Sequence, residues 1–579
     1  MSQAEPLFSG FPPVTYDGWK SRVLEELKGA DYAKIVWKTP EGFTMEPWYN
    51  RRTALPSPSV PFARSSNLWR ICVQIPASSP ETAAEAARIA IDGGADAIEY
   101  RFSDPAQAGP EALAYLLSAI DLSKVAIYLS GATGELRSLA ANLLNAAECP
   151  FIKGAILSES PDAADALVAI RPEGFRTLAV DTGRFHDAGA TITQEIAFAL
   201  AGTSDLISRA TESGITAERV AAAISVVFSA GTSHFPELAK LRAFRAMWAQ
   251  LLAAYGVPAT ECPEPEIFVR ASRRSASVLD PYTNILRLST QAVSAILGGC
   301  DTLQLSSFDP GGSVPSDLAG RITTNIHHLL REESGLDRVI DPAAGSSYID
   351  TLTATLCREA WKLFQQIEAA GGLRQAEANG TVASMTASAA EAQRKAINTR
   401  KRSLIGINRY AVLPSPEVTA LLKATPEAAA QAPEFEQLRV RVLAHVARTG
   451  SAPLAELWLH GDTVKCLRVA AFAEEFLRCG GFDVAPSATM PLETRSCRSV
   501  LQDEPDIVVL CWTGEDDLQA LPAILGTMQE LRKETVVVMA AKPPENAADL
   551  IRNGLDQFIH MGSDAYATLL SLQHKTGVL

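Results

Sequence analysis

A chain of 579 residues, with 47% hydrophobic and 20% charged residues, exceeds one hydrophobic core and has the composition of a soluble protein of two or three domains. Its formal charge of −14 disfavours nonspecific binding to nucleic acid or to an anionic membrane surface. Apolar runs stay below the ~18 residues of a membrane span, and the first residues lack a secretory signal pattern. The nine cysteines stand singly, without a CxxC pair, which favours a reducing cytoplasm over a disulfide framework or a zinc site.

Residues 1–60 are expected to form an arm that precedes the first domain. Apolar residues recur at helical intervals from Trp19 to Leu27, and a short strand-like run follows at 33–38. The proline-rich stretch 55–61 is expected to connect the arm to the next unit. Large side chains exposed on such an arm need a surface to lie against, on this chain or on a partner. They are Trp37, Trp48 and Tyr49.

Residues 61–400 alternate short apolar strands with alanine-rich helical patterns, such as 81–91 and 238–252, and end in trailing helices. Eight such units predict an α/β fold, a (β/α)8 TIM barrel. A doubly wound sheet is the alternative, although eight uniform repeats favour closure. The expected strands are Trp69–Ile75, Asp96–Phe102, Val125–Leu129, Ile152–Leu157, Thr177–Asp181, Ile224–Phe228, Glu266–Arg270 and Thr302–Leu305.

The stretch 280–309 combines a helix, a buried strand and a polar, glycine-rich loop at the carboxyl end of that strand. In parallel α/β proteins ligands usually bind at this edge. We therefore expect any site of the barrel to lie there.

Residues 401–450, rich in Pro, Ala and Glu after 411, are expected to link the barrel to a second, smaller α/β unit at 451–579. Five short strands alternating with helices predict a flavodoxin-like sheet in that unit. The expected strands are Leu457–Leu459, Phe482–Ala485, Ile507–Cys511, Val536–Met539 and Phe558–His560, and the expected helices are Phe472–Leu477, Leu518–Leu531 and Ala565–Leu572.

Six blocks of this sequence, in their order, resemble the cobalamin-dependent acyl-CoA mutases, and the methylmalonyl-CoA mutase family above all. The resemblance implies a substrate barrel followed by a cobalamin-binding domain, and a radical rearrangement of an acyl-CoA thioester for which the cofactor supplies the radical. The blocks are KIVWKTPEG (34–42), HDAGATITQEIAFAL (186–200), PELAKLRAFRAMWAQL (236–251), DPYTNILR (280–287), VIDPAAGSSYID (339–350) and SLIGINRY (403–410).

The family's cobalamin motif, DxHxxG, is incomplete in this chain. Asp462 matches the aspartate, but Val464 stands at the histidine that ligates cobalt and Leu467 at the glycine. Valine has no lone pair to give a metal, and leucine adds bulk where the cofactor tail passes. His460 lies four residues too early and is interpreted as an ordinary histidine at a strand end. The resemblance thus implies that this chain binds no cobalamin and no metal.

The polar groups that the family uses in its barrel are also missing. Neither register of 183–185 restores the family's Tyr-His pair, and His186 is the one imidazole nearby, which a one-residue deletion could bring into place. Ile75 matches the catalytic tyrosine if a one-residue insertion is allowed, Leu157 matches a glutamine and Ala223 an arginine. We therefore expect no catalytic residues in this chain.

Three basic or imidazole clusters remain. Arg270, Arg273 and Arg274 follow strand seven and could meet the phosphates of coenzyme A, although pairing with surface acids is favoured. The cluster 400–402 (Arg-Lys-Arg) is interpreted as a solvated surface patch. The pair 327–328 (His-His) lies within a helix, so the two side chains diverge by about 100° and do not share a metal.

This chain keeps the sequence blocks of the family's fold but lacks the residues of its active site. In this it resembles the family's small, or beta, subunit, which is noncatalytic and pairs with a catalytic large, or alpha, subunit. We therefore expect a cytoplasmic subunit of a heterodimeric isomerase that interconverts methylmalonyl-CoA and succinyl-CoA, with adenosylcobalamin in the partner. One alternative is an active acyl-CoA mutase with divergent substrate and cobalamin ligation. Another is a regulatory module that binds acyl-CoA without chemistry.

Overall fold

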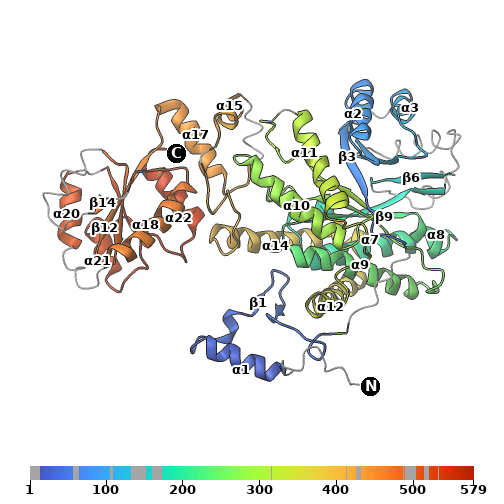
Figure 1. The fold of residues 1–579 in the computed structure, drawn as a ribbon, viewed down its shortest axis with the longest axis horizontal. Helices are drawn as coiled ribbons and strands as arrows, with labels where there is room; N and C mark the ends of the chain where they lie inside the picture. The colour runs from blue at the N-terminus through green and yellow to red at the C-terminus, as the bar shows by residue number, and fades with distance from the viewer. Residues whose placement is uncertain are drawn as a thin grey trace, which may run out of the picture.

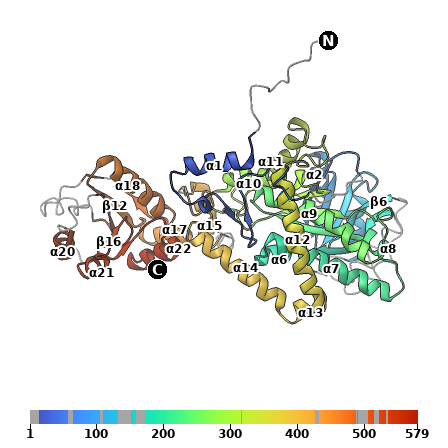
Figure 2. The same cartoon turned by 90° about the horizontal axis from the view of Figure 1, so that it is seen from below.

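The computed structural model contains two sheet-based units side by side, with the N-terminal arm at the lower edge of Figure 1 (Figures 1 and 2). The structure describes residues 14–56, 64–104, 109–131, 151–158, 173–314, 316–412, 414–424, 432–486, 488–489, 504–513, 521–531 and 534–579. Cys149 and the start of the helix expected at 518–531 lie outside these ranges. None of the described helices is both long and apolar enough to cross a bilayer.

The arm contains the predicted helix and a small antiparallel hairpin. The helix begins where the Thr15 side chain accepts a hydrogen bond from the Gly18 amide at 3.1 Å, and it buries none of its residues. The arm's elements are α1 (Tyr16–Glu26), η1 (Tyr32–Lys34), β1 (Trp37–Lys38) and β2 (Thr44–Met45).

Glu41, at the tip of the hairpin, anchors the arm to the barrel. Its carboxylate oxygens accept hydrogen bonds from the amides of Ile192 (3.1 Å) and Thr193 (2.7 Å), the first two residues of α7 (Ile192–Glu212). A carboxylate is favoured at a helix N-terminus because free N–H groups and the helix dipole both attract negative charge. Met45, 1% exposed, packs into the larger core and forms the second anchor.

The described residues of the larger unit form a parallel sheet in the order β7-β6-β5-β4-β3-β11-β10-β9-β8. Thr177 alone separates β7, which pairs with β6, from β8, which pairs with β9, so both are halves of the fifth strand. Pairing of β11 with β3 closes the ring, and the predicted (β/α)8 barrel is confirmed. The strands are β3 (Arg70–Pro76), β4 (Ala97–Arg101), β5 (Ala126–Ser130), β6 (Phe151–Ile156), β7 (Glu173–Arg176), β8 (Leu178–Asp181), β9 (Ile224–Ala230), β10 (Glu266–Ala271) and β11 (Thr302–Gln304).

Helices surround the barrel because each buries one apolar face against the sheet. In α7 a capping box of Thr191 and Gln194 fixes the first turn, and Asp280 caps α10 by accepting from Thr283. The other helices are α2 (Pro80–Asp92), α3 (Pro110–Ser118), α6 (Gly183–Ala188), α8 (Ala217–Ala222), α9 (His234–Ala254), α10 (Pro281–Leu297), α11 (Ser316–His328), the π-helix η3 (Leu329–Glu333), α12 (Ser347–Ala369), α13 (Gly372–Ala378) and α14 (Thr381–Asn398).

The smaller unit has a parallel sheet in the order β13-β12-β15-β16-β17, with β14 also paired to β12. Because β13 and β14 pair with successive parts of β12, they form one interrupted second strand, and the order is the 2-1-3-4-5 of flavodoxin-like folds. Its elements are β12 (Leu454–His460), α18 (Thr463–Arg478), β13 (Asp483–Val484), β14 (Ala488–Thr489), β15 (Ile507–Trp512), α20 (Leu521–Leu531), β16 (Val536–Met539), α21 (Ala547–Arg552), β17 (Gln557–Phe558) and α22 (Ala565–Lys575).

The segment 401–450 carries α15 (Pro416–Ala424) and α17 (Gln437–Thr449) and packs against both units. Its Phe435 and Leu438 lie in the core of the smaller unit. The buried carboxylate of Glu436 accepts hydrogen bonds from the barrel loop after β10, among them the Val278 amide at 2.8 Å. The two units are therefore joined by contacts as well as by the chain.

Candidate functional site

The interior of the barrel is filled by side chains in three layers. In the layer nearest the amino ends of the strands, Arg70 Nη1 lies 3.0 Å from Tyr128 Oη, 3.0 Å from Glu266 Oε1 and 3.0 Å from Thr302 Oγ1. Arg176 binds the other oxygen of Glu266 at 3.0 Å. Burial, and then the Glu266 carboxylate, raises the pKa of Tyr128 well above its usual value, so the phenol stays neutral.

The middle layer is apolar. The rings of Tyr128 and Phe268 meet edge to face with centroids 4.8 Å apart. These rings belong to a cluster of side chains that come from six strands and from the residue directly after one of them. Such a filled lumen is expected for an eight-stranded barrel. The cluster consists of Cys72, Ala97, Ala126, Tyr128, Ala155, Leu157, Val227 and Phe268.

The layer at the carboxyl ends of the strands is an ion-pair network. Arg270 of β10 binds Glu99 of β4 at 2.7 Å and Asp181 of β8 at 2.9 Å. Ser130 and Gln74 donate to Glu99 at 2.6 and 3.1 Å. Burial alone would raise the pKa of Glu99, but Arg270 and these donors hold it below the usual value. Arg270 thus pairs with acids across the lumen, and the prediction of surface acids as its partners was wrong.

His186 lies at the mouth of the barrel, in the short helix α6. Its Nε2 is 2.7 Å from Ser272 Oγ on the loop after β10, and its Nδ1 is 3.4 Å from Glu195 Oε2. Helix α6 ends at Gly189 (φ 106°), where a Cβ would come within 2.4 Å of Ala390 on α14. This close approach fixes the helix, and with it the imidazole.

Glu195 is fully buried and is bound by a lysine. Lys240 Nζ lies 2.9 Å from Glu195 and 2.6 Å from Glu237. Burial would raise the pKa of Glu195, but Lys240 and His186 hold it below the usual value. Glu195 therefore carries a negative charge beside His186.

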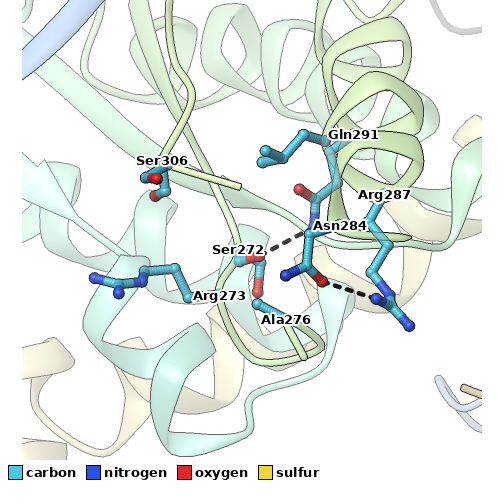
Figure 3. A pocket seen from close by; sticks show the side chains of 9 residues that line it. Ser272, Arg273, Ala276, Asn284, Arg287, Gln291 and Ser306 are labelled. Carbon is cyan, nitrogen blue, oxygen red and sulfur yellow. Dashed lines mark hydrogen bonds between the residues drawn. The ribbon is translucent and has the colours of Figure 1, made fainter. Parts of the chain in front are cut away.

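A pocket opens next to Ser272, between the loops after β10 and β11 and helix α10 (Figure 3). Its empty volume is about 300 Å³ with the open entrance included, and its interior has room for about one water. This is the edge at which the sequence predicted a site. The pocket is lined by Ser272, Arg273, Ala276, Asn284, Arg287, Leu288, Gln291, Ser306 and Ser307.

At the corresponding edge of the smaller unit, Asp462 caps helix α18 by accepting from the Lys465 amide at 2.9 Å. Val464 and Leu467, one turn apart, are 64% and 49% exposed. His460 is the last residue of β12, as predicted, and its ring lies 4.2 Å from that of Trp512. An aliphatic side chain at the position of the family's cobalt ligand, beside an aspartate used as a helix cap, does not fit lower-face ligation of cobalamin.

The three residues matched to polar site residues of the family lie in different parts of the barrel. Leu157 faces the lumen. Ile75 faces the helices outside the barrel, packed with Ala83 of α2, while Gln74 faces the lumen, so the match of Ile75 to a lumen tyrosine is corrected. Ala223 precedes β9, at the opposite end of the barrel from the mouth.

Arg184 points outward and binds Glu377 at 2.5 Å. Arg400 was predicted to be solvated, yet it is 8% exposed, binds Glu475 of α18 at 2.5 Å and lies over the ring of Phe476. The solvated interpretation is therefore wrong for Arg400, because a helix from the smaller unit covers it. Arg273 and Arg274 are exposed, and Arg274 binds Gln393 at 3.1 Å.

The two adjacent histidines diverge as predicted. His327 is 2% exposed and accepts a hydrogen bond from the Trp69 indole at 3.1 Å. Burial, then the charge of Arg331, lowers the pKa of His327 to about 3. His328 instead contacts the Gly93 carbonyl at 3.0 Å. Both imidazoles thus hold helix α11 and the chain around it against the amino end of the barrel.

The methylmalonyl-CoA mutase family model matches residues 167–457, half of the chain. This chain belongs to the methylmalonyl-CoA mutase family. The small subunit of methylmalonyl-CoA mutase from Porphyromonas gingivalis is 29% identical over 100% of this chain and 99% of its own. A probable small subunit from Mycobacterium bovis is 28% identical over 93% and 92%, and the small subunit from Streptomyces virginiae is 30% identical over 70% and 65%. Dihydropteroate synthase from Thermus thermophilus covers 45% of this chain and 94% of its own at 16% identity, with a TM-score of 0.27.

Within this mutase-family barrel, sequence reasoning missed the polar layers of the lumen. A signal for them exists in β3, where Arg70, Cys72 and Gln74 alternate with Ile71 and Val73. Such period-two alternation places the first set on one face, and the barrel turns that face inward. Ser272 and Glu195 carry no local signal, because their partner is on another element.

Proposed function

We propose that this chain is the noncatalytic small (beta) subunit of a heterodimeric, adenosylcobalamin-dependent methylmalonyl-CoA mutase, whose large (alpha) subunit interconverts methylmalonyl-CoA and succinyl-CoA. The observation that carries the proposal is the ion-pair network across the barrel mouth. Arg270, the cation of this layer, is already bound by Glu99 and Asp181.

Both acyl groups of that reaction carry a carboxylate, which a barrel site would bind through a cation left free for it. The three charged groups of the network sum to −1, so the network repels a further carboxylate. Releasing Arg270 would leave Glu99 as an uncompensated buried charge, at a cost of about 3–5 kcal/mol. Together with the packed lumen beneath it, this network supports a barrel that does not rearrange the thioester.

The smaller unit supports the same proposal for the cofactor. Val464 offers cobalt no lone pair, and Asp462 caps its own helix. We assign adenosylcobalamin to the large subunit and none to this chain. The division into arm (1–60), barrel (61–400), linker (401–450) and cobalamin-type unit (451–579) is part of the proposal.

The exposed aromatic residues of the arm support the proposal of a partner chain. Helix α1 buries none of its residues on this chain, yet the arm stacks Trp19 against Trp48 at 5.0 Å and leaves Trp37 39% exposed. Aromatic surface of this kind is typical of protein interfaces. We infer that the arm lies against the large subunit, as part of an obligate heterodimer.

The test uses the purified chain alone and together with a methylmalonyl-CoA mutase large subunit that carries an intact DxHxxG. Titration with adenosylcobalamin is followed by absorbance, and rearrangement of methylmalonyl-CoA by product analysis. We expect no cobalamin uptake and no rearrangement of methylmalonyl-CoA by this chain alone, and both by the pair. Stoichiometric cobalamin uptake, or rearrangement of methylmalonyl-CoA to succinyl-CoA, by the isolated chain would overturn the proposal, as would failure of the two chains to copurify.

A further inference from the structure

A serine, a histidine and a glutamate from three separate elements form a row at the mouth of the barrel. Ser272 Oγ lies 2.7 Å from His186 Nε2, and His186 Nδ1 lies 3.4 Å from Glu195 Oε2. Ser272 follows β10, His186 lies in α6 and Glu195 lies in the first turn of α7. A hydroxyl, a base and an acid that orients the base, in this sequence of contacts, are the parts of an activated nucleophile.

The charge of Glu195 determines the tautomer of His186. Because Lys240 holds the Glu195 carboxylate ionised, this carboxylate can only accept a hydrogen bond. The proton of the neutral imidazole therefore lies on Nδ1, and Nε2 presents its lone pair to the Ser272 hydroxyl. This tautomer is the one that a general base needs to take a proton from serine.

Ser272 is reachable from solvent through the pocket. Figure 3 shows Ser272 at the centre of the lining residues, with Arg273 on one side and Arg287 on the other. The interior of the pocket has room for about one water, so a substrate would approach from the open entrance and present a small acyl group. The Arg274 amide donates a hydrogen bond to Ser272 Oγ at 3.3 Å and so helps to fix the hydroxyl, and the Arg273 side chain lines the same pocket.

We propose that Ser272 is the nucleophile of an acyl-ester or acyl-thioester hydrolysis, an activity separate from the mutase role. Ser272 Oγ attacks the acyl carbonyl carbon while His186 Nε2 takes the hydroxyl proton. The C–O or C–S bond then breaks, and His186 returns this proton to the departing alkoxide or thiolate. Water attacks the acyl-serine, gives a proton to His186, and the acid leaves as that proton passes to Ser272 Oγ. Glu195 is a positioning residue.

The chain contains a matched control for this row. His234 Nδ1 lies 2.8 Å from Ser294 Oγ, but Ser294 is fully buried within helix α10. Both pairs thus have a contact between histidine and serine, but only Ser272 of the two serines lines the pocket. Only the first pair is expected to react.

The experiment treats the full-length chain with an alkyl fluorophosphonate, a serine-directed probe, and maps the adduct by peptide mass spectrometry. We expect one adduct, on Ser272, which is lost in Ser272→Ala. In His186→Gln the labelling rate should fall ~100-fold or more, the scale of general-base catalysis, and in His234→Gln it should stay unchanged. Circular dichroism and melting temperature check that each variant is folded.

Hydrolysis of p-nitrophenyl acetate tests the positioning role of Glu195. In Glu195→Gln, Lys240 keeps Glu237 as its partner at 2.6 Å, so no buried cation is left alone. We expect kcat to fall ~10-fold or more with KM unchanged, and Glu195→Asp to restore part of the loss. Absence of an adduct on Ser272, or labelling of folded His186→Gln at the wild-type rate, would reduce the row to a structural contact and overturn the proposal.

Discussion

The substitution Arg270→Met would leave two carboxylates, of Glu99 and Asp181, without the guanidinium that binds them at 2.7 and 2.9 Å. Glu99 is fully buried, so water does not replace the lost partner. Removing one member of a buried ion pair costs about 3–5 kcal/mol. At about 2 °C per kcal/mol for a unit of this size, the melting temperature of the barrel should fall by roughly 6–10 °C.

The loss should depend on pH. In the wild type Arg270 holds the pKa of Glu99 low against the effect of burial, so the pair contributes stability above the unfolded carboxyl pKa and loses it as the pH falls. In Arg270→Met burial is opposed only by the hydrogen bonds from Ser130 and Gln74, so the pKa of Glu99 rises and the carboxyl takes up a proton more readily as the pH falls. The deficit relative to wild type should therefore be larger at about pH 8 than at about pH 5.

The assay is scanning calorimetry of the full-length chain, with the transition of the smaller unit as an internal reference. Arg270→Met/Glu99→Gln should regain a large part of the lost stability, because the buried charge is gone. Arg184→Met, which breaks an exposed pair with Glu377, is the control and should cost less than about 1 kcal/mol. A barrel transition of Arg270→Met that coincides with wild type, or a double variant no better than the single one, would refute the reasoning.

Three further substitutions test other parts of the structure. The pKa of His327 is about 3 in the fold, whereas an unfolded chain binds this proton once the pH falls below the ordinary histidine pKa of about 6.5. Wild type should therefore lose about 2 kcal/mol of stability by pH 5 through this group. His327→Gln, measured by denaturation at several pH values, should flatten this dependence on pH. Glu41→Gln should cost about 1 kcal/mol at the start of α7 and make the arm cleave faster in limited proteolysis. Val464→His changes an exposed side chain, so the melting temperature should shift by less than about 1 °C, and absorbance should detect no cobalamin uptake while Leu467 remains.

Each of these expectations has a contrary outcome. An unchanged acid slope in His327→Gln would place the proton uptake elsewhere. A wild-type rate of proteolysis in Glu41→Gln would mean that the apolar contacts of the arm, such as those of Met45 and Tyr49, are enough to hold it. Tight cobalamin binding by Val464→His would show that one imidazole restores the cofactor site, against the argument from Leu467.

The register of one strand shows how a sequence comparison can choose the wrong face. Matching Ile75 to a catalytic tyrosine required a one-residue insertion, and in a strand such a shift moves every side chain to the opposite face. The barrel places Ile75 against α2 and Gln74 in the lumen. Arg400 shows a similar limit, because its neighbours in the chain are polar while its cover, α18, begins more than sixty residues later.

Local pattern in the sequence determined the strands and helices of both units, because alternation with period 2 and spacing near 3.6 are properties of neighbouring residues. It also determined that Val464, at the position proposed for the family's cobalt ligand, cannot coordinate a metal in any fold. The tertiary structure alone decided which charges compensate one another: Arg270 and Glu99 are 171 positions apart, and Ser272 and His186 are 86 apart. A closed barrel turns one face of every strand towards one axis, so the partner of a lumen charge is set by closure and register, which no window of sequence contains.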